Sequence, residues 1–180
     1  GKDCDILLMS ATPIPRSLIL AFYGDMDISK LIEKPMFRKS TITLSKPEEK
    51  IDEIIIFIKN QINNGQQIFW VCPLIEESKK LDYTAAIKKY DHLSKIFPNK
   101  IGLIHGSLNK DEKNKVLNNF LRKTIDILIS TTVIEVGIDF PNANIIVIEN
   151  SNKFGLSQLH QLRGRVGRGI KQGTCILLYK

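Results

Sequence analysis

Short apolar runs recur along this chain, separated by amphipathic or polar stretches. Six of the runs predict strands, and they cover Ser40–Leu44, Gln67–Ile75, Lys100–Gly106, Ile125–Thr131, Asn144–Asn150 and Gly173–Lys180. Most of their residues are apolar without alternation, which is typical of parallel strands buried on both faces of a sheet. An earlier run, Ile6–Met9, predicts one more buried strand, which ends at Ser10.

Amphipathic helices are predicted between most of these runs. Isoleucines recur at helical intervals after the first of the six strands, at Ile51, Ile54, Ile55, Ile58 and Ile62. Ser45 and Glu48 have the spacing of a capping box before this helix, and Gly65 supplies its C-terminal end. Other helices are predicted over 16–23, 81–96 and 156–162, and after the N-cap Asn109, with the apolar stripe Val116, Leu117, Phe120 and Leu121.

The alternation of strands and helices predicts an α/β fold. Residues 38–180 are expected to form a doubly wound parallel sheet with helices covering both faces. Residues 1–37 are expected to be the tail of a preceding domain and a linker, because Gly24–Lys39 has mixed charge and contains Pro35. A domain rarely opens on a central strand, so we expect the chain to be a piece of a longer protein.

The charge is unevenly distributed. Lys and Arg number 26 against 19 Asp and Glu, and Ser151–Lys180 holds six basic residues and no acidic one. This favours an anionic partner, which on charge alone is a nucleic acid, a nucleotide or an acidic lipid surface. The three cysteines lie far apart, no residues have metal-ligand spacing, and no apolar run is long enough to cross a bilayer. We therefore expect a reduced, cytoplasmic protein with no metal site of its own.

Ligands of an open α/β sheet gather beyond the carboxyl ends of its strands. We expect four loops at that edge: Ser10–Thr12, His105–Glu112, Ser130–Pro141 and the arginine-rich turn after the helix over 156–162. In the third loop, the hydroxyls of Thr131 and Thr132 and the bend at Gly137 and Asp139 suit phosphate oxygens. An ordinary turn with a capping threonine explains that loop as well, and Gly106 also fits a plain turn.

The arginine-rich turn reads RGRVGR over residues 163–168. Its three guanidinium groups require solvent, a distant carboxylate or an anionic ligand, since buried unpaired charge is costly. Gly164 and Gly167 would allow close backbone approach and unusual dihedral angles. Arg165 and Arg168 are three residues apart, so a helical or turned backbone points both toward one bidentate phosphate contact. The alternative is a solvated charged turn.

The segments SAT, TTVIEVGID and QLRGRVGR resemble motifs III, V and VI of superfamily two helicases, in that order. Within that superfamily, MSATPIPRSLILAFYGDMDIS, VCPLIEES and HQLRGRVGRG resemble the ATP-dependent DNA helicases that remodel stalled replication forks and recombination junctions. The resemblance covers essentially the whole chain. It implies a RecA-like C-terminal motor lobe that acts in DNA repair and recombination.

The same resemblance assigns roles to single residues. It implies that Arg165 and Arg168 are catalytic and reach the ATP phosphates, and that Gln161, Gly137 and Asp139 bind the nucleotide. It implies that Thr131, Thr132, His105 and Gly106 contact DNA. It also implies that Ser10, Ala11 and Thr12 couple hydrolysis to strand movement.

The chain has no G-x-x-x-x-G-K-[ST] phosphate loop and no acidic box before SAT. The resemblance therefore implies that the ligands of ATP and Mg²⁺ on the other side of the cleft belong to a first motor lobe. We expect the chain by itself to be inactive, and the whole protein to act as a monomer on branched DNA. The alternatives are a transcription-repair coupling translocase, an RNA helicase, or a stand-alone nucleic-acid-binding module.

Overall fold

The computed structural model describes Leu7, Met9, Ser29 and residues 39–73, 79–131, 140–167 and 171–180. The chain divides into two compact units, Gly1–Pro35 and Met36–Lys180. In the first unit, Leu7 and Met9 lie outside any strand and are 80% and 81% exposed. The prediction of a buried strand is therefore wrong at these two residues, because an apolar run forms a strand only beside another strand that supplies hydrogen-bond partners. Ser10–Thr12 and the helix predicted over 16–23 lie outside the described residues.

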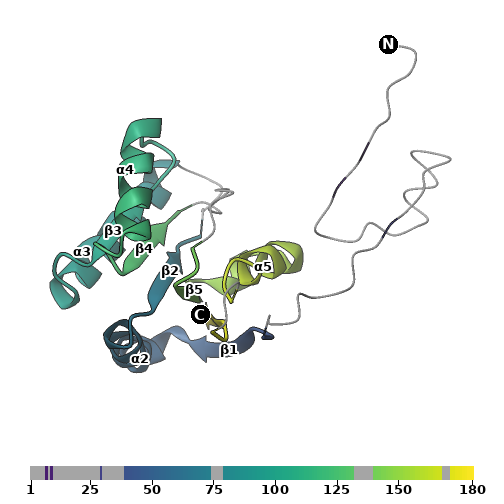
Figure 1. The fold of residues 1–180 in the computed structure, drawn as a ribbon. Coiled ribbons are helices and arrows are strands. Elements are labelled where there is room, and N and C mark those ends of the chain that lie inside the picture. The colour runs from purple at the N-terminus through teal and green to yellow at the C-terminus, as the bar shows by residue number, and fades with distance from the viewer. Residues whose placement is uncertain are drawn as a thin grey trace, which may run out of the picture. The chain divides into compact units, whose positions relative to one another are not determined.

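The second unit contains a six-stranded sheet in which every pairing is parallel (Figure 1). In chain order the strands are β1 (Ile42–Pro47), β2 (Gln67–Val71), β3 (Ile101–Ile104), β4 (Ile127–Ser130), β5 (Ala143–Ile148) and β6 (Thr174–Tyr179). Their order across the sheet is β1-β6-β5-β2-β4-β3. All six predicted strands are thus present, with ends shifted by a few residues.

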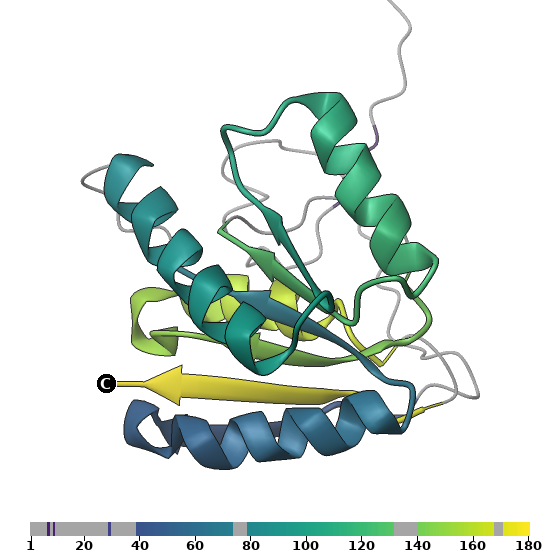
Figure 2. The same cartoon turned by 90° about the vertical axis from the view of Figure 1, so that its left-hand side faces the viewer.

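Helices cover both faces of this sheet, as predicted. They are α2 (Ile51–Asn63), α3 (Lys79–Ile96), α4 (Lys110–Leu121) and α5 (Leu156–Arg163), with short 3₁₀ turns at Glu48–Lys50 and Ser151–Lys153. Apolar residues of α2 and α3 pack with alternate strand residues such as Trp70, and those of α4 and α5 pack with the other set, which includes Phe69. In Figure 2, α2 lies alongside β6. The predicted doubly wound α/β fold is confirmed.

The capping box predicted at Ser45 and Glu48 is wrong. Ser45 lies inside β1, where it pairs with Leu177 of β6, and the strand continues to Pro47. Ladder pairing with a neighbouring strand therefore overrides a local capping signal at this position. The end of α2 is as predicted, since Gly65 has φ of +72° and its N–H donates to the carbonyl of Ile62 at 2.8 Å.

The N-cap of α4 is confirmed. The Asn109 side chain accepts from the Glu112 N–H at 2.8 Å, and the Glu112 carboxylate accepts from the Asn109 N–H at 3.0 Å. Leu117 and Phe120 are buried, whereas Leu121 is 40% exposed and does not belong to the predicted stripe. Leu121 is the last residue of α4, where the chain already turns toward β4.

No helix among the described residues is long and apolar enough to cross a membrane.

Candidate functional site

The carboxyl edge of the sheet brings four side chains into one row. Glu149, Cys72, Thr131 and His105 each come one residue after the end of β5, β2, β4 and β3. Backbone hydrogen bonds hold them in register: Glu149 N–H donates to Val71 at 2.9 Å, and Thr131 N–H donates to Ile104 at 3.2 Å. Thr131 and His105, both predicted DNA contacts, therefore follow adjacent strands at the predicted edge.

His105 and Gly106 begin the turn after β3. The Leu108 N–H donates to the His105 carbonyl at 3.2 Å, and Gly106 has open space where a Cβ would lie. Partial burial lowers the pKa of His105, with Lys113 adding to this and Glu112 opposing it. The imidazole is therefore neutral at pH 7 and offers hydrogen bonds rather than a full charge. The DNA-binding role of both residues stays a prediction.

The segment that begins at Thr131 connects the two edges of the sheet. Thr131 is buried at the carboxyl end of β4, and the residues 132–139, which include Thr132, Gly137 and Asp139, lie outside the described residues. The chain is described again at Phe140, whose ring packs against Phe69 and Phe120 at centroid distances of 5.6 and 5.2 Å. The carbonyl of Asn142 then accepts from Gln67 N–H at the amino end of β2, at 2.8 Å.

The arginine-rich turn lies at the amino edge of the sheet, so its predicted place at the carboxyl edge is wrong. The turn follows α5 and leads into β6, which runs parallel to both β1 and β5. A helix that follows a parallel strand runs back along the sheet, and its C-terminal end reaches the edge where the strands begin. The predicted DNA contacts Thr131 and His105 and the predicted nucleotide contact Arg165 therefore lie at opposite edges.

Arg163, the first of the three arginines, has a partner within the fold. Arg163 Nη2 donates to the backbone carbonyl of Thr41 at 2.8 Å, although the sequence indicated solvent, a carboxylate or an anionic ligand for every guanidinium in the turn. A carbonyl oxygen is an equally good acceptor, and sequence does not show which carbonyls a fold brings near. Arg165 is half-buried and Gln161 is exposed on α5, whereas Arg168 lies outside the described residues.

The two glycines of the turn differ from each other. Gly167 has φ of +70°, and a Cβ there would lie 3.0 Å from both Cα and N of Gly173. Gly164 caps α5 with φ of −68°, so the prediction of an unusual dihedral angle is wrong for Gly164. A residue other than glycine fits the Gly164 conformation, because the helix simply continues into it.

A buried ion pair at the carboxyl edge was not predicted. Lys89 Nζ of α3 lies 2.6 Å from Glu149 Oε1 and 5.5 Å from the Trp70 ring centroid. The Cys72 thiol donates to Glu149 Oε2 at 3.8 Å, and burial, followed by the Glu149 charge, raises its pKa. An acid directly after an apolar strand is the sequence signal for this pair. Among the described residues, no three His, Cys, Asp or Glu side chains gather as metal ligands would.

Comparison with known proteins shows the family to which this chain belongs. The helicase conserved C-terminal domain matches residues 47–169. The ATP-dependent DNA helicase RecG of Thermotoga maritima is 52% identical over 180 residues, which is 99% of this chain and 23% of that protein. RecG of Bacillus subtilis is 49% identical over 99% of this chain and 26% of its own length. The chain thus spans about a quarter of the curated relatives it matches.

Solved structures of helicases have the same fold as this chain. A RecG bound to a three-way DNA junction superposes with a TM-score of 0.77 at 49% identity, over 95% of this chain and 22% of that chain. Domain 2 of the DEAD-box helicase Mss116p, bound to an RNA duplex, has a TM-score of 0.54 at 21% identity, over 78% of this chain and 54% of its own, and shows the shared fold alone. These relatives are named ATP-dependent DNA helicases, the group that the sequence motifs resemble, so that resemblance is confirmed. The chain belongs to the family of helicase conserved C-terminal domains.

Proposed function

We propose that this chain is the second motor lobe of an ATP-dependent DNA helicase of the RecG kind. The observation that carries the proposal is the 52% identity with a RecG over 99% of the chain. A RecG of the same fold has been solved on a three-way DNA junction, which supports branched DNA as the substrate. The whole protein would act in DNA repair and recombination, as a monomer in the cytoplasm, and would use ATP with Mg²⁺.

The two edges of the sheet suit two different ligands in this proposal. At the carboxyl edge, the partly exposed, neutral His105 ring offers hydrogen bonds to a nucleic-acid backbone, whereas Thr131, the other proposed DNA contact, is only 4% exposed and would have to be uncovered to reach one. At the amino edge, Arg165 is half-buried in a stretch from Ser151 to Lys180 that contains no acidic residue, which fits an anionic ligand such as ATP phosphate. Residues 131–142 begin at the first edge and end at the second, and thus provide a direct covalent connection between them.

The polar side chains of RGRVGR are all arginines, which supply positive charge and N–H donors but no general base. The part of this turn in hydrolysis is therefore limited to binding the phosphates and stabilising negative charge on the transferred phosphoryl group. Arg165 and Arg168 would serve as these groups, with Gln161, Gly137 and Asp139 near the nucleotide and Ser10, Ala11 and Thr12 coupling hydrolysis to movement. The magnesium ligands would belong to the first motor lobe.

The experiment is DNA-stimulated ATP hydrolysis and unwinding of a three-way DNA junction by the full-length protein. The variants Arg165→Ala and Arg168→Ala should lower kcat by roughly 10³ or more while junction binding is retained. Lys171→Ala is the matched control. This substitution also removes one positive charge between α5 and β6, but at an exposed residue that has no proposed role. Near-normal kcat in both arginine variants, or equal unwinding of an RNA duplex, would contradict the proposal.

A further inference from the structure

We infer that Arg163 is a positioning residue, which fastens the α5–β6 turn to the start of β1 and thereby sets how the turn presents its arginines to phosphate. The inference rests on the proposed function, since it concerns the same arginine-rich turn. It assigns to the first arginine of RGRVGR a role distinct from that of Arg165 and Arg168.

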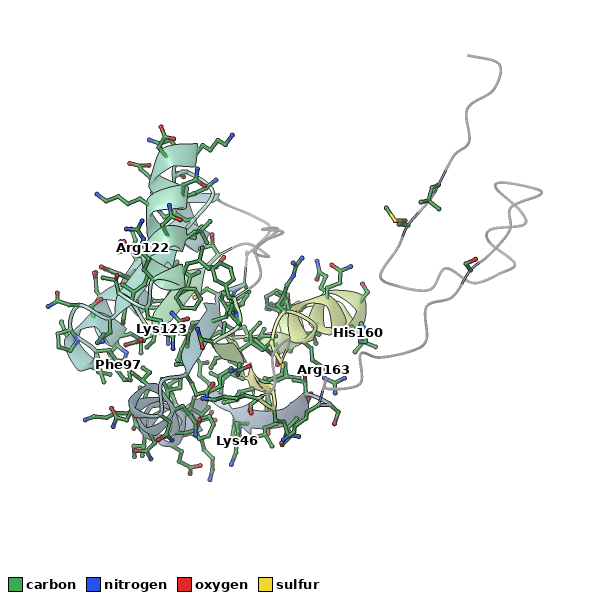
Figure 3. All side chains as sticks on the ribbon, in the orientation of Figure 1. Lys46, Phe97, Arg122, Lys123, His160 and Arg163 are labelled. Atoms are coloured by element: carbon green, nitrogen blue, oxygen red, sulfur yellow. The ribbon has the colours of Figure 1, made fainter. Side chains whose placement is uncertain are left out.

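The first observation is the direct bond. Arg163 Nη2 donates to the Thr41 carbonyl at 2.8 Å across 122 residues of sequence, and the contact is partly buried. Its Nε atom is buried and makes no hydrogen bond within the described part of the chain. The Arg163 charge also acts on Cys175 of β6, where it lowers the thiol pKa against the larger effect of burial. Figure 3 shows Arg163 beside the place where the chain enters β1. This guanidinium is thus held against the start of β1.

The second observation is that Thr41 lies close to both Gly167 and Gly173, the two glycines on either side of residues 168–172. Its Oγ1 lies 3.3 Å from the position that a Cβ would take at Gly167, and 3.0 Å from the equivalent position at Gly173. The next residue, Ile42, donates its N–H to the Gly173 carbonyl at 2.8 Å. A Cβ added at Gly167 would lie only 3.0 Å from the Gly173 backbone, so the two glycines approach each other closely, with Thr41 beside both.

These contacts make the turn and the entry to β1 move together. Displacing Ser40–Ile42 without the turn would break both the Arg163–Thr41 bond and the Ile42–Gly173 bond. Ser40–Ile42 also lies near the start of the second unit, Met36–Lys180, where the chain passes into β1. A change in the path of that segment would therefore alter the orientation of Arg165, and a misplacement of about 1 Å can cost about 100-fold in rate.

The test uses the full-length protein and compares Arg163→Met with Arg163→Lys. Arg163→Met should lower kcat for DNA-stimulated ATP hydrolysis by about 10- to 100-fold, with the KM for ATP and the junction affinity within about twofold. Arg163→Lys retains a charged donor and should recover part of kcat. Arg122→Met is the matched control: it removes an exposed arginine from the same edge of the sheet and should leave kcat unchanged.

A second variant keeps the test decisive if Arg163→Met does not fold. Arg163→Gln leaves a polar amide in the partly buried site but is too short to keep the bond to the Thr41 carbonyl, and it should lower kcat about 10-fold without loss of DNA binding. If folded Arg163→Met or Arg163→Gln hydrolyses ATP at the wild-type rate, Arg163 is only a structural contact and the inference is wrong. If the wild-type protein itself shows no DNA-stimulated hydrolysis, the proposed function fails instead.

Discussion

Lys89 and Glu149 form a buried ion pair that joins helix α3 to the end of strand β5. Their side chains are 20% and 12% exposed, and Nζ and Oε1 are 2.6 Å apart. The same ammonium lies over Trp70, the only tryptophan in the sequence. The pair therefore links one face of the sheet to the centre of its carboxyl edge, next to the residues proposed to bind DNA.

Removing one partner of this pair should destabilise the fold strongly. Lys89→Met leaves Glu149 buried without its cation, which is expected to lower the free energy of unfolding by roughly 3 kcal/mol. Urea unfolding followed by Trp70 fluorescence measures the change.

The Lys50–Glu53 pair provides the control for this substitution. Its charged atoms are 2.8 Å apart, but the two side chains are 49% and 56% exposed, so Lys50→Met leaves a solvated carboxylate and should change the free energy of unfolding far less. Equal losses in the two variants would show that burial does not set the strength of the Lys89–Glu149 pair.

Glycine 167 should be intolerant of any side chain. Gly167→Ala combines a left-handed backbone with a Cβ 3.0 Å from the Gly173 backbone, and should cost about 2–3 kcal/mol of unfolding free energy. Gly65→Ala is matched in φ, at +72°, but has nothing within 4 Å of its Cβ, and should cost about 1 kcal/mol. Thermal unfolding of both variants separates the collision from the backbone strain, and an equal loss would argue against the contact with Gly173.

The thiol of Cys175 should make stability fall at alkaline pH. Burial raises the pKa of this thiol to about 11, against a smaller opposing effect of Arg163. Above about pH 9 the unfolded thiol loses its proton while the folded one keeps it, so the free energy of unfolding should decrease from pH 9 to 11. Cys175→Ala should be less stable at pH 8 and show a shallower decrease. Parallel curves for the two proteins would exclude a contribution from Cys175.

His105 should contact DNA without contributing a charge. Because burial lowers its pKa, the ring is neutral at pH 7.5. His105→Asn in the full-length protein should weaken junction binding severalfold while the slope of log K against log salt stays unchanged, since no counterion-releasing contact is lost. A smaller slope in the variant would mean that the ring is protonated when bound.

The sequence predicted the fold well because its strands are uniformly apolar and its helices are amphipathic. Local signals were less reliable where distant residues decide the outcome. Asn109 with Glu112 and Ser45 with Glu48 have the same spacing, yet only the first pair caps a helix, because Ser45 is paired with Leu177 in the sheet. Periodicity within α4 likewise did not reveal that its last residue, Leu121, faces solvent.

The candidate site was predicted in part. Thr131 and His105 lie at the expected edge because the carboxyl ends of parallel strands meet there. The arginine-rich turn was placed at the wrong edge, although chain direction through α5 gives the correct one. The partners of Arg163 and Lys89 lie 122 and 60 residues away along the chain, and although the acid after β5 is visible in the sequence, nothing local shows which cation it meets.

The contact between Gly167 and Gly173 also bears on how this connection can vary in length. The contact fixes the two ends of residues 168–172, so the sheet does not depend on how many residues lie between them. Doubling the length of a closed segment costs only about 0.6 kcal/mol in closure entropy. Insertions after Lys171 should therefore leave β6 in register, which makes this position suitable for a peptide tag or a fluorescent label at the amino edge of the sheet.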